Sequence, residues 1–199
     1  GENSISTIVN QEEFTIQDLE PRTYYDVYVR SVCSEINKSE WVGPLSFRTN
    51  CQDGMETPWI ETFEDYADIS ESCFMTIGED RYTNHTLATG KYANVGDKGM
   101  LLSLAQYKEL YVVLPRFADK LSDLKIVFDY YSEEHDGVTG DLILGVMSDL
   151  SDKLTFKQMF VYGTTEEYVT VRETLENVGE EYDRGWIVFK WCNFREEWS

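Results

Sequence analysis

The stretch Leu142–Phe156, LILGVMSDLSDKLTF, decides the fold that we expect of this chain. Its first part is a strand candidate, because apolar residues alternate along it and so fall on one face of an extended segment: Leu142, Leu144 and Val146. Two Ser-Asp pairs, beginning at Ser148 and Ser151, then interrupt the apolar run as turn residues do. A second strand candidate begins at Phe156. The stretch therefore predicts two consecutive β-strands joined by a polar turn.

Strand candidates of the same kind recur along the back two-thirds of the chain. In the segment 124–131 four apolar residues face one way: Leu124, Ile126, Phe128 and Tyr130. No convincing helix pattern and no repeat of fixed period interrupts these short runs, so the sequence predicts an all-β, antiparallel jelly-roll β-sandwich. The candidates are Gly99–Leu104, Glu109–Leu114, Leu124–Tyr131, Asp141–Met147, Phe156–Phe160, Tyr168–Leu175 and Trp186–Cys192.

The front of the chain has a different texture, which predicts a separate domain over residues 1–50. Three strand candidates lie there: Phe14–Leu19, Thr23–Cys33 and Leu45–Thr49. Residues 51–58 are interpreted as a linker, since Asp53-Gly54 is a turn signal and Pro58 keeps the residue before it out of helical geometry. The second domain then covers residues 59–199.

The composition limits the partners that this chain can have. Of its 199 residues, 42% are hydrophobic, which is enough for a packed core. Its net charge of −20 repels phosphate, so the sequence predicts no nucleic-acid partner and disfavours docking on anionic lipid. The acidity is typical of a soluble surface, and the alternative interpretation is calcium ligation by carboxylates.

No apolar run approaches the roughly 20 residues of a membrane helix. No signal peptide is visible either, and we expect any export signal to have been removed ahead of Gly1. The expected location is extracellular or at the cell surface.

Residues 19–49 carry a resemblance to fibronectin type III domains. The phrase L-x-P-x-T-x-Y is present from Leu19 to Tyr25, and W-x-G-P-x-x-F-x-T is present from Trp41 to Thr49. The resemblance implies that the hydroxyl of Tyr25 bonds to backbone a few residues upstream. Only the last three or four of seven strands are present, so we expect a partial immunoglobulin-like sandwich. Its apolar face is expected to pack on the second domain or, by self-association, on a second copy: Tyr25, Val27 and Val29.

Residues 59–191 resemble the MAM-like jelly rolls of bacterial surface proteins, the group that includes cleaved-adhesin and choice-of-anchor J domains. The resemblance lies in four phrases: ETFEDY at 61–66, VLP at 113–115 followed by the strand 124–131, GVMSD at 145–149, and WIVF at 186–189. Such domains commonly finish with one more strand that carries paired aspartates, which the sequence up to Ser199 lacks. The resemblance implies an adhesion or ligand-binding module whose partner is a glycan or a host or matrix protein.

The same resemblance implies a structural calcium ion near the opening phrase. Glu64 matches the residue that would bind it, and Asp65 is a second candidate ligand. The closing aspartates that would complete the site are missing. No other cofactor is expected.

The four cysteines are Cys33, Cys51, Cys73 and Cys192. They form no C-x-x-C pair, and with two histidines in the chain a zinc site is not expected. We predict a Cys33–Cys51 disulfide, whose loop would stabilise the fold by about 3 kcal/mol, although both thiols being reduced is the alternative. For Cys73 and Cys192 a bridge and two free buried thiols both remain open.

Few side chains suggest catalysis. His85 and His135 lie in polar stretches beside acids, and no nucleophile motif accompanies them. Paired carboxylates are expected by chance in so acidic a chain, so we predict no catalytic residue and no enzyme. Among five tryptophans, Trp59 and Trp198 are the freest to stack on a sugar ring, with core packing as the alternative.

These observations predict a non-catalytic extracellular adhesion or ligand-binding module of a bacterial cell-surface protein. The alternative is an accessory domain of a secreted hydrolase whose catalytic domain lies outside this sequence. A structural spacer is the third hypothesis.

Overall fold

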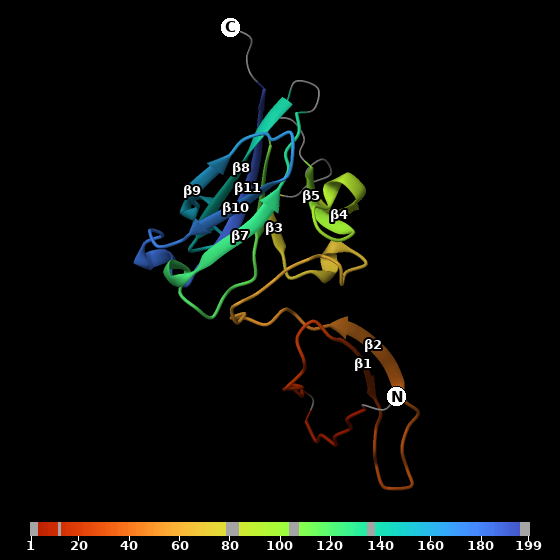
Figure 1. Ribbon diagram of the computed structural model, residues 1–199. Helices are drawn as coiled ribbons and strands as arrows, with labels where there is room; N and C mark the ends of the chain where they lie inside the picture. Colours follow the sequence, from red (N-terminus) through yellow and green to blue (C-terminus); the bar gives the residue numbers. More distant parts are fainter. Residues whose placement is uncertain (1–3, 12, 79–83, 104–107, 135–137, 196–199) are drawn as a thin grey trace. The chain divides into compact units, whose positions relative to one another are not determined.

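The structure, a computed structural model, describes residues 4–11, 13–78, 84–103, 108–134 and 138–195 (Figure 1). Within these ranges the only helices are single turns of 3-10 helix, and the named strands all pair antiparallel. The expectation of an all-β antiparallel sandwich is confirmed. The chain divides into two compact units, 1–52 and 53–199. Across the described ranges, no helix has both the length and the hydropathy of a membrane span.

The first unit contains one hairpin, formed by β1 (Tyr24–Val29) and β2 (Val42–Arg48). Tyr25 lies opposite Phe47, and their rings stack with centroids 6.0 Å apart. The hydrogen bond expected of Tyr25 is present, because the backbone N–H of Glu20 donates to its hydroxyl at 2.9 Å. The strand expected over 14–19 is wrong, since these residues pair with no other segment that the structure describes.

The apolar face of this hairpin is only partly covered. Tyr25 and Val27 are half-buried, whereas Val29 is 61% exposed. The guanidinium of Arg30 lies 4.3 Å from the ring of Trp41, and Trp41 is exposed. The expected packing of the apolar face on another surface therefore stays a prediction.

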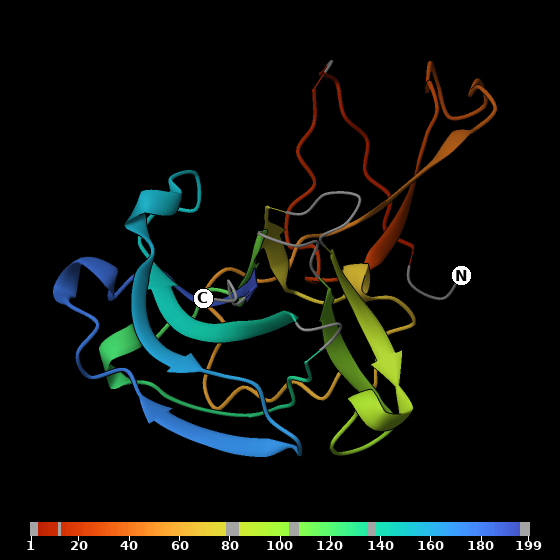
Figure 2. The same cartoon turned by 90° about the horizontal axis from the view of Figure 1, so that it is seen from above.

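The second unit contains a five-stranded sheet, a two-stranded layer and a separate hairpin (Figures 1 and 2). The order in the large sheet is β3-β6-β11-β8-β9, so strands distant in sequence are neighbours. The smaller layer is β10-β7, and the hairpin is β4-β5. The bounds are β3 (Met75–Ile77), β4 (Asn84–Thr89), β5 (Lys98–Ser103), β6 (Glu109–Val113), β7 (Lys125–Tyr130), β8 (Val138–Met147), β9 (Lys157–Tyr162), β10 (Val169–Thr174) and β11 (Trp186–Arg195).

The main core lies between the large sheet and the β7–β10 layer. The alternation expected along β7 is confirmed: its even-numbered residues are half-buried and its odd-numbered ones exposed. Phe128 makes an edge contact with Phe189 of β11, with centroids 4.8 Å apart. The residues buried in this core are Leu114, Phe117, Leu121, Leu144, Val146, Leu175, Val178 and Ile187.

The stretch 142–156 folds as two strands and a turn, but β8 is buried on both faces. Leu144 and Val146 face the main core, while Met147 belongs to a second cluster on the other side of the sheet. The turn brings Phe156 back over that second cluster. It is held by two aspartates whose carboxylates accept backbone N–H groups: Asp149 from Ser151 at 2.8 Å and Asp152 from Leu154 at 2.9 Å.

Gly145 lies at the register shift between β8 and β9. A Cβ atom there would lie 2.5 Å from the carbonyl oxygen of Lys157 and 2.7 Å from the ring of Phe156. Any larger residue would push the turn away from the sheet, so this glycine is required by close packing.

The predicted Cys33–Cys51 disulfide is wrong: Cys51 bonds to Cys73, and Cys33 is an exposed free thiol. The hairpin register explains the error. Tyr24 lies opposite Arg48 and Val32 opposite Lys38, so Cys33 sits near the tip of the hairpin and Cys51 beyond its other end. At about 3.3 Å per residue the two are roughly 30–40 Å apart, whereas a disulfide needs Cα atoms within about 7 Å. Cys192 is a buried free thiol, and burial raises its pKa.

The Cys51–Cys73 bond closes a loop with twenty-one residues between its ends. We expect the Cys51→Ser, Cys73→Ser double variant to lose about 3 kcal/mol of unfolding free energy, because the unfolded chain gains the entropy of the opened loop. The measurement is the urea midpoint. Cys33→Ser is the matched control and should leave the midpoint unchanged; an equal loss in the control would contradict the assignment.

Candidate binding cleft

A cleft of about 1600 Å³ opens in the second unit, larger than most small-molecule sites. Its floor comes from the inner face of the large sheet, where every second residue of β11 contributes: Ile187, Phe189 and Trp191. Two other walls come from β5 and β7, which contribute consecutive residues. The segment 57–64 forms a further wall. We call this space the β5–β7 cleft.

The wall segment is fixed to the loop after β6, so residues 53–58 do not behave as a free linker. The N–H of Met55 donates to the carbonyl of Arg116 at 2.8 Å, and Ala118 N–H donates back to the carbonyl of Met55 at 3.0 Å. The hydroxyl of Thr57 donates to Asp119 at 2.5 Å.

Trp59 lines the cleft, but its ring is part of the packing beneath it. The ring centroid lies 5.9 Å from that of Phe74 and 5.7 Å from that of Phe117, which belongs to the main core. Trp59 therefore combines half-buried packing with a place in the cleft wall, and its role in binding stays a prediction. The second tryptophan of the prediction, Trp198, lies outside the described residues.

The side chain of Glu61 stabilises the turn that follows it. Its carboxylate accepts the N–H of Phe63 at 2.8 Å and the hydroxyl of buried Tyr66 at 2.6 Å. Phe63 has a φ of 65°, a conformation that non-glycine residues adopt rarely. These bonds hold the turn in place, and the Phe63 ring packs on Phe74 with centroids 5.6 Å apart.

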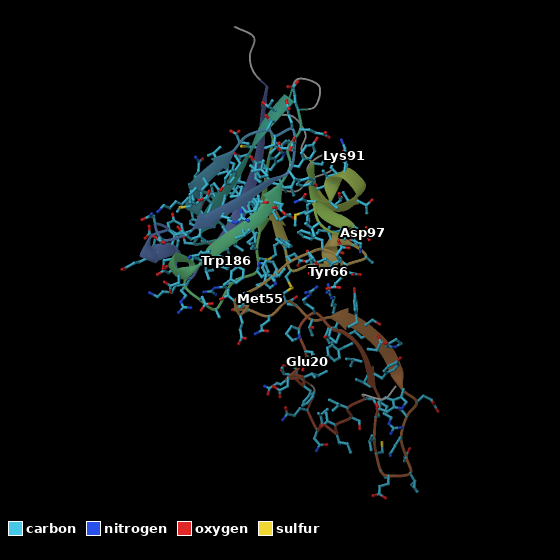
Figure 3. The ribbon with its side chains drawn as sticks, viewed as in Figure 1. Glu20, Met55, Tyr66, Lys91, Asp97 and Trp186 are labelled. Carbon is cyan, nitrogen blue, oxygen red and sulfur yellow. The ribbon has the colours of Figure 1, made fainter. Side chains whose placement is uncertain are left out.

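Glu64 is clamped by the loop before β5. Its Oε1 accepts the N–H groups of Asp97 at 2.8 Å and Lys98 at 2.9 Å. Gly96 has a φ of 79°, which favours glycine, and a Cβ there would lie 2.4 Å from the same oxygen, so a larger residue would displace the carboxylate from its two N–H groups. Figure 3 marks Tyr66, Asp97 and Lys91 on the side of the unit that carries β4 and β5.

The surroundings of Glu64 already contain a cation that belongs to the chain. The Lys98 ammonium donates to the backbone carbonyls of Glu64 at 2.9 Å and Tyr66 at 2.5 Å. Asp65, the second candidate ligand, is exposed, and the described residues include no group of three side chains suited to a metal. These residues do not fit a calcium site as arranged, because the ion would have to displace Lys98 from its two carbonyls.

Polar bonds tie the loop after β4 to the end of β7. The ammonium of Lys91 lies 2.9 Å from Glu133, and the Asn94 amide donates to Asp129 at 2.9 Å. Asp129 also accepts the hydroxyl of Thr170 at 2.5 Å. The Thr170 bond and then the Asn94 bond hold the pKa of Asp129 below its ordinary value.

The described lining contains neither histidine nor cysteine. His85 lies on β4 opposite Leu102 and is not part of the lining, and His135 lies outside the described residues. The acids of the cleft serve as acceptors: Glu61, Glu64 and Asp129 take the bonds described above. Hydrogen bonds from Tyr131 and Lys91 lower the pKa of Glu133. The lowered pKa values of Asp129 and Glu133 are opposite in direction to the raised pKa that a general acid needs.

A charged pair, Lys190 and Glu109, lies on the face of the large sheet that is opposite to the cleft. Lys190 of β11 pairs with Glu109, and its ammonium lies 5.4 Å from the ring of Tyr111. The hydrogen bond from Lys190 is the main cause that lowers the pKa of Glu109. This pair neutralises charge over the second apolar cluster.

No protein-family model, curated protein or solved structure matches this chain. The resemblances to fibronectin type III and MAM-like domains therefore stay predictions. Sequence reasoning did not single out the residues of β5 and β7 that line the cleft, because no sequence pattern marks a strand that borders a cavity.

The Glu64 clamp predicts a stability loss. Glu64→Ala removes two hydrogen bonds to a charged acceptor and should lower the free energy of unfolding by about 2 kcal/mol. Asp65→Ala, at an exposed neighbouring acid, is the control and should change it by less than about 0.5 kcal/mol. Chemical denaturation measures both, and equal losses would contradict the clamp.

Calcium should leave the melting temperature of the unmodified protein unchanged at millimolar concentration, because Lys98 holds the carbonyls that the ion would need. Differential scanning fluorimetry with calcium and with EDTA checks this. A calcium-dependent rise that Glu64→Ala abolishes would show that the ion displaces Lys98 after all.

The Glu109–Lys190 pair predicts a pH dependence. Since the folded pKa of Glu109 lies below its unfolded value near 4.5, its contribution is present above that pH and is lost as the pH falls through the folded pKa. Unmodified protein should therefore be more stable than Glu109→Gln at pH 6–7, and the difference should shrink below about pH 4.5. Urea titrations from pH 3 to 7 measure it; a constant difference would contradict the ion pair.

Proposed function

We propose that this chain is a non-catalytic ligand-binding module of an extracellular or cell-surface protein. The observation that carries the proposal is the β5–β7 cleft, a large space with an apolar floor and a rim of polar bonds. Apolar walls with a few placed polar groups are the ordinary composition of a binding site.

Two further observations support the proposed location and class. The Cys51–Cys73 disulfide is typical of proteins in oxidising compartments. The resemblance of the second unit to MAM-like modules of bacterial surface proteins favours adhesion to a glycan or to a host or matrix protein. An accessory role beside a catalytic domain is compatible with the same cleft, since binding would again be its task.

The pKa values and hydrogen bonds of the carboxylates in the cleft support a role without catalysis. A glycosidase needs one protonated and one ionised carboxyl at a set separation, and a general acid needs a raised pKa. In the cleft, Asp129 and Glu133 have lowered pKa values instead. The carboxylates of Glu61 and Glu64 accept backbone N–H groups and so have a structural role.

Exposed apolar residues at the cleft provide the test. Val95 and Val127 line the cleft and are 77% and 61% exposed, so Val95→Asp, Val127→Asp should preserve the fold. We expect the unmodified chain to bind a member of a panel of glycans, collagen and fibrinogen, and the double variant to bind at least tenfold more weakly. Surface plasmon resonance measures the affinities.

Leu154→Asp is the matched control, because Leu154 is exposed and does not line the cleft. It should bind like the unmodified chain. Hydrolysis of any glycan or protein on the panel by the purified chain, or binding that the cleft variant leaves unchanged, would overturn the proposal.

A further inference from the structure

Two strand edges open onto the same cleft without a partner. Among the described residues, β7 pairs only with β10, and β5 pairs only with β4. Each strand therefore presents a row of backbone N–H and C=O groups that faces no neighbouring strand among the described residues, although at the start of β5 the Lys98 N–H already donates to Glu64. In a sheet, such a row binds another strand wherever one can approach.

The pattern of lining residues shows that these are the edges that face the cleft. A strand that turns one face to a cavity contributes every second residue, as β11 does with Ile187, Phe189 and Trp191. In contrast, residues 123–133 and 98–103 line the cleft without a gap. A strand that presents its edge to a space contributes its inward and its outward side chains, so this pattern favours an edge-on position for β5 and β7.

A buried hydroxyl in the cleft supports a missing hydrogen-bonding partner. Ser132 follows β7, is 6% exposed, and its Oγ has no hydrogen-bond partner among the described residues. Its backbone is already paired on the β10 side, where Thr165 N–H donates to the Ser132 carbonyl at 2.6 Å. An unsatisfied buried hydroxyl is costly, and a ligand with backbone polar groups would satisfy it.

We propose that the β5–β7 cleft binds an extended peptide segment of another protein, which adds as a strand between the edges of β5 and β7. This inference rests on the proposed function and names its ligand class. Alternate side chains of the segment lie on the apolar floor, and its N–H and C=O groups alternate between the two edges.

The charged residues that line the cleft indicate which net charge a bound peptide segment should have. Acids outnumber lysines there, so an uncharged or basic segment is favoured over an acidic one. The acids are Glu61, Glu64, Asp123, Asp129 and Glu133, against Lys98 and Lys125.

Other ligands and other edges fit less well. A glycan would leave both rows of backbone groups unpaired. The outer edges of β9 and β10 each offer one row, whereas the cleft offers two rows and a floor. A strand in the cleft therefore forms about twice the backbone hydrogen bonds that it would form at either outer edge.

The probe is the acetylated, amidated peptide Lys-Val-Thr-Val-Thr-Val-Lys, with two N-methylated forms, one at the three valines and one at the two threonines. Successive residues of a strand point their N–H groups to opposite sides. A strand between two edges therefore needs both sets, and each N-methylated form should bind at least tenfold more weakly. Isothermal titration calorimetry on the full chain measures this.

Ser132→Ala separates ligand binding from folding. It should weaken peptide binding about three- to tenfold, because one hydrogen bond is lost, and it should keep or raise the melting temperature. Amide hydrogen exchange should slow in β5 and β7 on peptide binding and stay unchanged in β9.

Four outcomes would overturn the inference: no saturable peptide binding at millimolar concentration, sensitivity to only one N-methylated form, protection of β9 or β10 alone, or dimerisation of the chain through the cleft without peptide. Glycan binding that the Val95→Asp, Val127→Asp variant abolishes would overturn the strand inference and leave the proposed function standing. Hydrolysis of the panel would overturn the proposed function itself.

Discussion

The second unit depends on the pairing of β11, which lies in the middle of the large sheet. Val188 is opposite Val113 of β6 on one side and Gly145 of β8 on the other. Neither β6 nor β8 pairs with the other, so the sheet is continuous only through β11. Its residues supply both clusters, with Ile187 in the main core and Val188 in the second cluster. Because β11 comes last among the strands, the sheet closes only after contacts of long sequence separation have formed.

Many of the acidic residues in this chain stabilise its turns. Many of its carboxylates accept backbone N–H groups or hydroxyls in turns, as Asp149, Asp152, Glu61 and Glu64 do. These bonds hold irregular segments against a sheet without help from regular structure. The segment 57–64 is the clearest case, since it has no named strand and still forms a wall of the cleft.

Much of the fold could be predicted from alternation. The strands at 109–113, 125–130 and 186–195 begin within one residue of the expected positions, because each has an apolar face against a core. The strands β3 and β4 were missed: β3 has three residues, and the apolar content of β4 is interrupted by polar ones. At the candidate site, Trp59 lines the cleft, but its packing on Phe74 and Phe117 could not be predicted, because no local pattern specifies these contacts.

The sequence by itself determined the all-β class and the polar turn after β8, since side-chain period and turn chemistry act between residues close along the chain. The bond of the Tyr25 hydroxyl was expected from a resemblance of the sequence, and the structure contains it. Only the tertiary structure decided that Cys51 bonds to Cys73, that the Lys98 ammonium donates to the carbonyls of Glu64 and Tyr66, and that β5 and β7 line one cleft. Each of these depends on which distant segments become neighbours. That choice is made by the packing of whole layers, and it leaves no mark on the spacing of residues within any one strand.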